Sequence, residues 1–145
     1  MKRFHVNLTV KDIDKSVAFY STLFAAQPTR RESDYAKWML DDPFINFSIS
    51  THGDTAGIDH IGLEAGDEDE LSIIRDRLVQ AETPIFDQDA TTCCYAKSKK
   101  AWISDPDGVA WETFFTSGTS TDYGEDADDV MAALETSKSA AQSCC

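Results

Sequence analysis

The sequence predicts an α+β fold in which two similar βαβββ modules combine into one cup-shaped sheet. Residues 4–10 and 58–64 each alternate apolar and polar side chains as a half-buried strand does, and each segment carries a histidine near its start. A helical pattern and then strand-like runs follow each segment, and residues 38–43 and 102–106 match in order and type. Because a single open module would leave its sheet face uncovered, two paired modules are the simplest account.

The first module is expected over about residues 1–52. Its helix begins at Asp12, a residue type favoured at N-caps, and continues with apolar residues at helical spacing. Strands are expected over 36–40 and 44–49, joined by a turn at Pro43, whose ring fixes φ. This order leaves room for one more strand after the helix.

The second module is expected over about residues 57–116 and repeats the same order. An amphipathic helix is predicted over 67–81. The turn that precedes the last strand has the sequence Asp-Pro-Asp-Gly, a strong turn signal. The strand segments expected after the helix are residues 84–86, 94–96, 101–104 and 109–115.

Charge and composition exclude several classes of partner. The chain has 145 residues, enough for one domain with a hydrophobic core or two small modules that share one. Its net charge is −13, from 13 Lys and Arg against 26 Asp and Glu, so nucleic acid and anionic membranes would be repelled. The first residues lack the apolar stretch of a secretory signal, and no window is long enough to span a membrane. We therefore expect a cytoplasmic protein.

The last segment, residues 117–145, differs in composition from the rest of the chain. It is rich in Ser, Thr, Ala and Asp, has almost no large apolar residue, and ends in Cys144 and Cys145. We expect an acidic, disordered tail with one short helix over 126–136. Two roles are open for it: solubilisation, or the relay of a metal or metalloid to the rest of the protein through its cysteines.

Two histidines and one glutamate form a candidate metal site. In the paired-module fold the first strands of the two modules lie at equivalent places, so His5 and His60 can face one another. Alternation along the last strand places Glu112 on the same face as Ala110 and Phe114, where a carboxylate needs a reason to be. Two imidazoles and one carboxylate form the facial triad of a mononuclear non-haem Fe(II) site. The alternatives are a core histidine on each strand and a solvent-facing Glu112.

A pair of adjacent cysteines, Cys93 and Cys94, lies among small and polar residues. Adjacent thiolates can bind one soft, thiophilic atom together. Their spacing does not fit the Cys-x-x-Cys redox motif, and two ligands cannot complete a structural zinc site. The lysines that follow, at positions 97, 99 and 100, indicate an exposed segment and either favour the thiolate form or make a solvated cluster. Two free thiols on a loop remain the alternative.

Several motifs together resemble one superfamily. They are the sequence HVNLTVKD at 5–12, the strand sequence DHIG at 59–62, and DPDG at 105–108 shortly before Trp-Glu. These segments resemble the vicinal oxygen chelate superfamily, which includes glyoxalases, bleomycin-resistance proteins and extradiol dioxygenases. The resemblance covers about residues 4–115, so the corresponding domain is expected over 1–116.

Within that superfamily, one subgroup has the closer likeness. Residues 35–40, 91–96 and 108–114 look like the organoarsenical carbon–arsenic lyases and their close relatives, the cadmium-induced proteins. The run Thr-Cys-Cys-Tyr-Ala within the second of these segments is the specific part. The superfamily motifs alone would leave the reaction open.

The resemblance implies a particular enzyme. It implies an Fe(II)-dependent dioxygenase that cleaves the carbon–arsenic bond of trivalent organoarsenicals, such as methylarsenite or reduced aromatic arsenicals, and releases arsenite. It further implies that His5, His60 and Glu112 hold the iron, with Glu112 as the catalytic residue, while Cys93 and Cys94 bind the arsenic. Some members have Gln in place of His5. The two modules close within one chain or swap with a second chain, so a homodimer is one expected assembly.

Other functions compete with this one. Glyoxalase-type isomerisation uses four protein ligands, and no carboxylate or imidazole lies near Phe47, the counterpart of Glu112. An extradiol dioxygenase would share the iron site but has no use for adjacent cysteines. The strongest competitor is a non-enzymatic cadmium or arsenite binder that sequesters metal through its thiols. Tyr35 and Tyr95 are candidates for a general acid or base, and His52 is expected to take no part.

Overall fold

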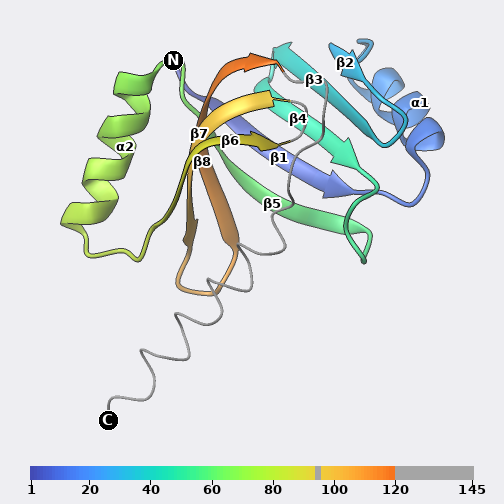
Figure 1. Cartoon of the computed structure of the whole chain (residues 1–145). Helices are drawn as coiled ribbons and strands as arrows, with labels where there is room; N and C mark the ends of the chain where they lie inside the picture. Colours follow the sequence, from blue (N-terminus) through green and yellow to red (C-terminus); the bar gives the residue numbers. More distant parts are fainter. Residues whose placement is uncertain (94–95, 120–145) are drawn as a thin grey trace. The chain divides into compact units, whose positions relative to one another are not determined.

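The structure is a computed structural model that describes residues 1–93 and 96–119. These residues form eight strands and two helices, so the α+β class is confirmed (Figure 1). The chain divides into two compact units, Met1–Glu64 and Ala65–Cys145. The predicted helix over 126–136 and the terminal cysteines lie outside the described residues. Neither described helix has the length and apolar character that crossing a membrane requires.

The first unit is a five-stranded sheet with one helix. Its strands follow the spatial order β2-β3-β4-β1-β5. Strand β1 pairs in parallel with β4 and antiparallel with β5, which is why β5 belongs to this unit. The elements are β1 (Arg3–Thr9), α1 (Ile13–Leu23), β2 (Arg30–Arg31), β3 (Tyr35–Asp41), β4 (Phe44–Ser50) and β5 (Gly57–Glu64).

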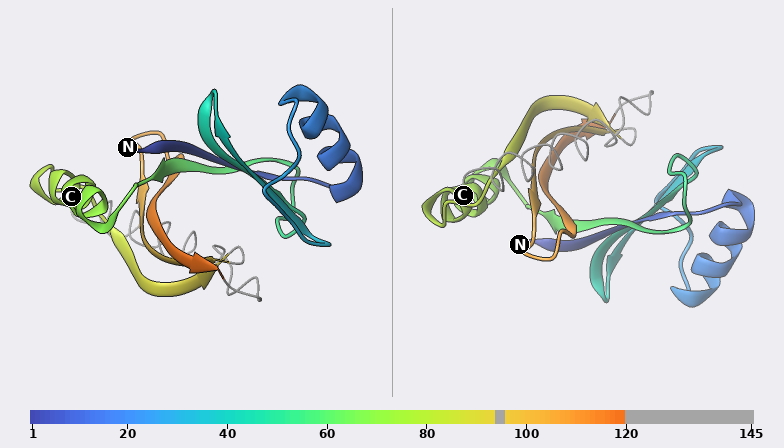
Figure 2. Two further views of the ribbon diagram at one scale, coloured as in Figure 1. Left: turned by 90° about the horizontal axis from the view of Figure 1, so that it is seen from above. Right: turned by 90° about the horizontal axis from the view of Figure 1, so that it is seen from below.

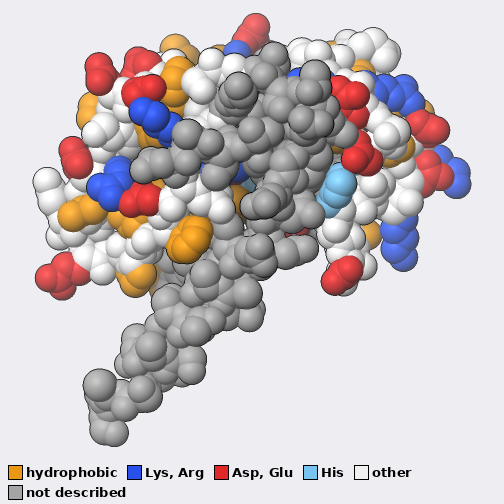
Figure 3. Space-filling model, in the orientation of Figure 1, with side chains coloured by type: hydrophobic (Ala, Val, Ile, Leu, Met, Phe, Trp, Pro, Cys, Tyr) orange, Lys and Arg blue, Asp and Glu red, His pale blue; other side chains and the backbone are white. Residues whose placement is uncertain are grey.

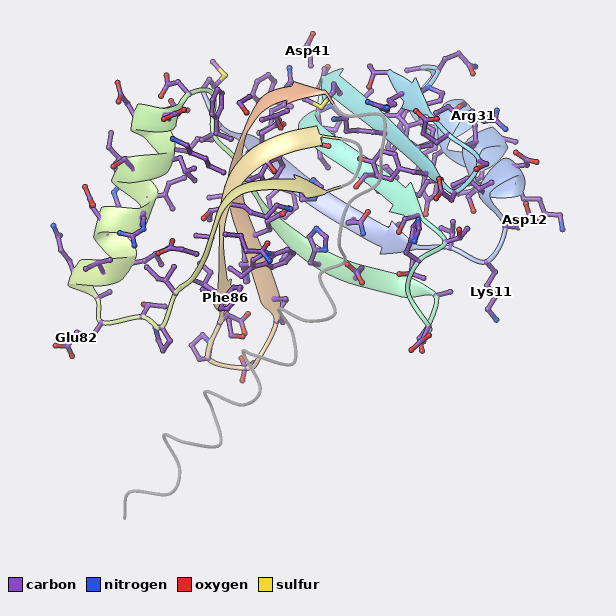
Figure 4. All side chains as sticks on the ribbon, in the orientation of Figure 1. Lys11, Asp12, Arg31, Asp41, Glu82 and Phe86 are labelled. Carbon is purple, nitrogen blue, oxygen red and sulfur yellow. The ribbon has the colours of Figure 1, made fainter. Side chains whose placement is uncertain are left out.

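Helix α1 begins where the sequence predicts. The carboxylate of Asp12 accepts a hydrogen bond from the backbone N–H of Lys15 at 3.0 Å, which satisfies one of the unpaired donors of the first turn. This bond also holds the pKa of Asp12 below its usual range. Figure 4 labels Asp12 at the start of this helix. Figure 2 shows α1 standing to one side of the strands of its unit.

Alternation along the strands gives this sheet one apolar and one polar face. Side chains of α1 and the apolar face form the core of the unit, with Trp38 and Ile49 fully buried at its centre. The opposite face carries buried polar side chains in cross-strand register, because His5 pairs with Asn46, Asn7 with Ser48 and Thr9 with Ser50. Buried polar groups need partners, so this polar face marks the part of the unit suited to a site.

The second unit contains α2 (Glu68–Gln80) and three antiparallel strands in the order β6-β7-β8. They are β6 (Phe86–Cys93), β7 (Ala96–Ser104) and β8 (Ala110–Thr119). The carboxylate of Asp67 accepts a hydrogen bond from the backbone N–H of Glu70 at 2.7 Å, which caps α2. Helix α2 packs against β8, and Figure 2 shows that the strands of this unit bend strongly along their length.

The turn between β7 and β8 is built on Asp105. Its carboxylate accepts hydrogen bonds from the backbone N–H groups of Asp107 at 3.0 Å and Val109 at 2.9 Å. Gly108 has a φ of +91°, a conformation that a side chain would strain. The bond from Val109 is the main reason that the pKa of Asp105 lies below its usual range.

Two strands of this unit are longer than predicted. The sequence indicates short strands over 84–86 and 94–96 and an exposed basic segment before residue 101, but β6 extends over Phe86–Cys93 and β7 over Ala96–Ser104, so the basic segment lies within a strand. Lys100, expected in an exposed cluster, is 6 % exposed, because pairing with β8 holds it inside the sheet. Strand β8 reaches Thr119, so residues 117–119 at the start of the predicted tail are part of the sheet.

The described surface mixes charges of both signs. Ion pairs link Arg31 to Asp14, Arg75 to Asp87 and Lys99 to Glu68 on the surface. Figure 3 shows basic side chains next to acidic ones on the face that it presents. Such exposed pairs contribute little to stability, since water and salt screen them.

Candidate functional site

The structure brings His5 and His60 together on the polar face of the first unit. Their Nε2 atoms lie 3.1 Å apart and the ring centroids 5.2 Å apart. Each residue is 6 % exposed. His5 comes from β1 and His60 from β5, which are adjacent antiparallel strands, so the sheet itself fixes the spacing of the two rings.

The hydrogen bonds of the other ring nitrogens fix the tautomers. Nδ1 of His5 lies 3.0 Å from the backbone oxygen of Asn46, and Nδ1 of His60 lies 2.6 Å from Oδ2 of Asp59. Because a carbonyl oxygen and a carboxylate can only accept, both Nδ1 atoms carry the proton and donate it. When the rings are neutral, both Nε2 atoms therefore present lone pairs.

Two lone pairs that face each other across 3.1 Å repel unless a positive charge lies beside both. A divalent cation that both imidazoles ligate removes this repulsion, and hydrogen bonding of the distal nitrogens to carbonyl or carboxylate groups is the usual support for metal-binding histidines. This half of the site therefore fits a metal ion that prefers nitrogen ligands.

A buried acceptor lies beside this histidine pair in the strand register. Asn46 faces His5 across the β1–β4 ladder and is 2 % exposed. Its Nδ2 donates to Glu64 Oε2 at 3.0 Å, which fixes the orientation of the amide. Its Oδ1 is buried with no hydrogen-bond partner among the described residues. A buried acceptor without a donor costs free energy. The position beside Asn46 Oδ1 therefore suits a hydroxyl group or a water molecule that donates to this oxygen.

Glu112 belongs to the second unit, where it is buried as predicted. It lies on β8 and is 5 % exposed. Its Oε1 accepts a hydrogen bond from Nζ of Lys100 on β7 at 2.7 Å. The ammonium of Lys100 also lies 5.8 Å from the ring centroid of Trp102. In this buried ion pair each charge lies beside one of opposite sign, which offsets part of the cost of burying both.

The structure describes the cysteine pair only in part. Cys93 is the last residue of β6 and pairs with Ala96 at the start of β7. Cys94 lies outside the described residues. The backbone of Cys93 therefore belongs to a strand that pairs with β7, whereas the sequence left open a loop at this position.

Other predicted residues are placed as follows. Tyr35 begins β3 and is 2 % exposed. Nε2 of His52 lies 2.8 Å from Oδ2 of Asp34. Tyr95 is outside the described residues. Sequence reasoning missed the supporting groups Asp59 and Lys100, and the one available signal for them was the adjacency of Asp59 to His60.

Comparison with known proteins finds one family and relatives with two different names. The Glyoxalase/Bleomycin resistance protein/Dioxygenase superfamily matches residues 2–113. A protein of Bacillus sp. (strain MD1) named "Trivalent organoarsenical cleaving enzyme" is 41% identical over 124 residues, which are 82% of this chain and 76% of that protein. The "Cadmium-induced protein CadI" of Mycobacterium tuberculosis is 31% identical over 125 residues, which are 86% of this chain and 82% of that protein.

A solved structure supports the fold. The Mn(II)-bound glyoxalase from Novosphingobium aromaticivorans superposes with a TM-score of 0.57 at 18% sequence identity. The match covers 94% of this chain and 53% of the glyoxalase chain, so this chain spans about half the length of that protein. At this level of identity the likeness concerns the fold alone.

Proposed function

This chain belongs to the Glyoxalase/Bleomycin resistance protein/Dioxygenase superfamily, and from that membership we propose that it is an enzyme that cleaves the carbon–arsenic bond of trivalent organoarsenicals. The proposed reaction uses Fe(II) and dioxygen and releases arsenite. The relative named as a trivalent organoarsenical cleaving enzyme supports this substrate class, since 41% identity extends over most of both chains.

The observation that carries the proposal is the pair of facing Nε2 atoms. Two neutral imidazoles whose lone pairs converge at 3.1 Å fit a divalent cation that accepts nitrogen ligands. We propose that His5 and His60 hold Fe(II) together with Glu112. The burial of Glu112 on β8 of the second unit supports this assignment.

The remaining roles concern the arsenical. Trivalent arsenic is soft and binds thiolates, so we assign Cys93 and Cys94 to grip the arsenic atom from two sides. Fe(II), when bound, would supply the one-electron chemistry that activation of dioxygen requires. The contribution of the protein is then positioning, because thiolates fixed in one place hold the carbon substituent in one orientation. A substrate without a thiophilic atom would lack this anchor.

The decisive experiment measures arsenite release from methylarsenite. Purified protein is loaded with Fe(II) under anaerobic conditions and given methylarsenite with and without dioxygen. Arsenite is expected only when Fe(II) and dioxygen are both present, and a chelator added before Fe(II) loading should abolish the release. No arsenite under any of these conditions would overturn the proposal.

Paired variants separate the two halves of the site. A Cys93→Ser/Cys94→Ser variant should lose methylarsenite binding and keep Fe(II) binding, while Glu112→Gln should weaken Fe(II) binding and keep the arsenical. Cys144→Ser/Cys145→Ser is the matched control, because it removes the other adjacent thiol pair. Normal turnover by the Cys93→Ser/Cys94→Ser variant would show that the thiol assignment is wrong.

A second candidate function is sequestration of a thiophilic metal without catalysis. The similarity to a protein named as cadmium-induced favours it, and so does the adjacent thiol pair. It predicts tight Cd(II) or arsenite binding and no dioxygen consumption in the presence of methylarsenite. Dioxygen uptake measured with an electrode alongside the arsenite assay distinguishes the two functions.

A further inference from the structure

We propose that Asp59, together with Asn7 and Ser48, forms a hydrogen-bonded relay that fixes the imidazole of His60 in its metal-binding tautomer. The inference rests on the proposed metal site and extends it to three residues that are not ligands. Asp59 is a positioning residue in this scheme, because it acts on the metal only through His60.

The relay runs across three adjacent strands of the first unit. His60 on β5 donates from Nδ1 to Oδ2 of Asp59 at 2.6 Å, and Asn7 on β1 donates from Nδ2 to the same oxygen at 3.3 Å. Ser48 on β4 donates from Oγ to Oδ1 of Asn7 at 2.8 Å. Each step has one donor and one acceptor, so the orientation of every group in the chain is determined.

The backbone explains how two consecutive residues come to share a hydrogen bond. In a regular strand, successive side chains point to opposite faces, so Asp59 would point away from the ring of His60. The ladder between β1 and β5 pairs Asn7 with His60 and then Leu8 with Ile58. Asp59 is therefore the extra residue of a β-bulge, an irregularity that redirects side chains and is frequent beside active sites.

Burial shows where the relay is rigid and where it meets water. Asn7 is 4 % exposed and Ser48 is 2 % exposed. The side chain of Asp59 is 35 % exposed, against 7 % for that of His60. The buried end of the relay thus holds the carboxylate in place, and the half-exposed carboxylate keeps its charge solvated. A carboxylate on Nδ1 raises the basicity of Nε2 and prevents the proton from moving there.

The test compares Asp59→Asn with the wild type, and Asp54→Asn serves as the matched control because Asp54 is an exposed acid in the loop before β5. Proton–nitrogen correlation spectra of the imidazole rings are recorded on the metal-free protein at about pH 8, above the ordinary His pKa of about 6.5. In the wild type, His60 should carry its proton on Nδ1. In Asp59→Asn, the amide can offer a donor to Nδ1, so part of the population should move the proton to Nε2.

Affinity for Co(II), a spectroscopic stand-in for Fe(II), gives the second measurement. Asp59→Asn should bind Co(II) about 10–100-fold more weakly than the wild type, and Asp54→Asn should match the wild type. Asn7→Ala keeps the bond between Asp59 and His60 but removes the hydrogen bond that Asn7 donates to the carboxylate, so it should show a smaller loss. Circular dichroism confirms that the variants compared are folded.

The outcomes also separate this inference from the proposed function. An unchanged His60 tautomer in Asp59→Asn overturns the relay, whatever the Co(II) affinity, because the carboxylate then does not set the proton position. If the wild-type protein binds no divalent metal, the proposed function is wrong. The tautomer of His60 in the metal-free protein still tests the relay in that case. If the wild-type protein cleaves methylarsenite and Asp59→Asn matches it in both His60 tautomer and Co(II) affinity, the relay is wrong and the proposed function stands.

Discussion

The two histidines of the first unit differ in the charge of the group that holds them. His5 donates to a neutral backbone carbonyl, that of Asn46, whereas His60 donates to the carboxylate of Asp59. A carboxylate partner makes an imidazole a stronger donor to a metal than a carbonyl partner does. At the scale of single residues, His60 is therefore expected to be the stronger nitrogen ligand of the proposed site.

This difference predicts unequal effects of removing the two rings. His60→Gln should weaken Co(II) binding more than His5→Gln. The ring lost in His5→Gln is the one whose Nδ1 donates to a neutral carbonyl, which makes it the weaker metal ligand. Each metal-free variant is titrated with Co(II), and the absorbance of the bound Co(II) gives its affinity. Equal losses, or a larger loss for His5→Gln, would contradict the ranking.

The buried pair in the second unit predicts a stability effect. Lys100→Met removes the ammonium that bonds Glu112 inside the sheet, so the metal-free variant should lose about 3–5 kcal/mol of unfolding free energy. Lys100→Met/Glu112→Leu should regain most of this loss, since both charges of the pair are then removed. Urea denaturation measures both variants.

The neighbouring residue provides the control for that experiment. Lys99 forms an exposed ion pair with Glu68, and the side chain of Lys99 is 47 % exposed. Lys99→Met should therefore cost less than about 1 kcal/mol. A similar cost for Lys99→Met and Lys100→Met would show that burial does not set the strength of the inner pair.

At the scale of elements, the turn between β7 and β8 predicts a pH dependence. Its carboxylate, that of Asp105, has a pKa lowered from the usual 3.8 because backbone N–H groups bond the charged form. A group with a lowered folded-state pKa stabilises the fold above its unfolded pKa and loses that contribution as pH falls through the folded value. The difference in stability between wild type and Asp105→Asn should thus shrink as pH falls below about 4.

Urea denaturation at a series of pH values checks this expectation. Asp107→Asn, an exposed position in the same turn, is the control and should follow the wild type across the series. A constant difference between the wild type and Asp105→Asn over the acidic range would show that the charge of Asp105 does not stabilise the turn.

The elements also show what the sequence could and could not predict. Both helices and the strands beside them were predictable because period and capping residues agree at Asp12 and Asp67. The full length of β7 was not, because a run of lysines looks like a loop when the glutamate that pairs with Lys100 lies on another strand. The histidine pair was predictable from the repeat. Its support by Asp59 was not, because regular strand alternation places Asp59 and His60 on opposite faces and the β-bulge that brings them together has no sequence signal here.

At the scale of the whole molecule, the segment beyond β8 carries much of the charge. Residues 120–145 contain six Asp and Glu against one Lys, so their removal changes the net charge from −13 to −8. The superfamily match ends at residue 113. A chain that ends at Thr119 should therefore keep wild-type turnover of methylarsenite and become less soluble at high concentration, since net charge keeps proteins apart.

Arsenite release and the light scattering of concentrated samples measure these two effects. The full-length Cys144→Ser/Cys145→Ser variant keeps the charge and removes only the thiols, so it separates the two contributions of the segment. Reduced turnover in both variants would favour a thiol relay over a solubilising role.

The two-residue strand β2 has a consequence for self-association. It ends the strand order of the first unit, and both of its residues, Arg30 and Arg31, are charged. A long, uncharged strand in that position would offer a row of backbone donors and acceptors to any other copy of the chain. A strand of two residues offers almost none, even though its guanidinium groups form ion pairs with Glu32 and Asp14. This end of the first unit is therefore a poor template for edge-to-edge pairing between copies.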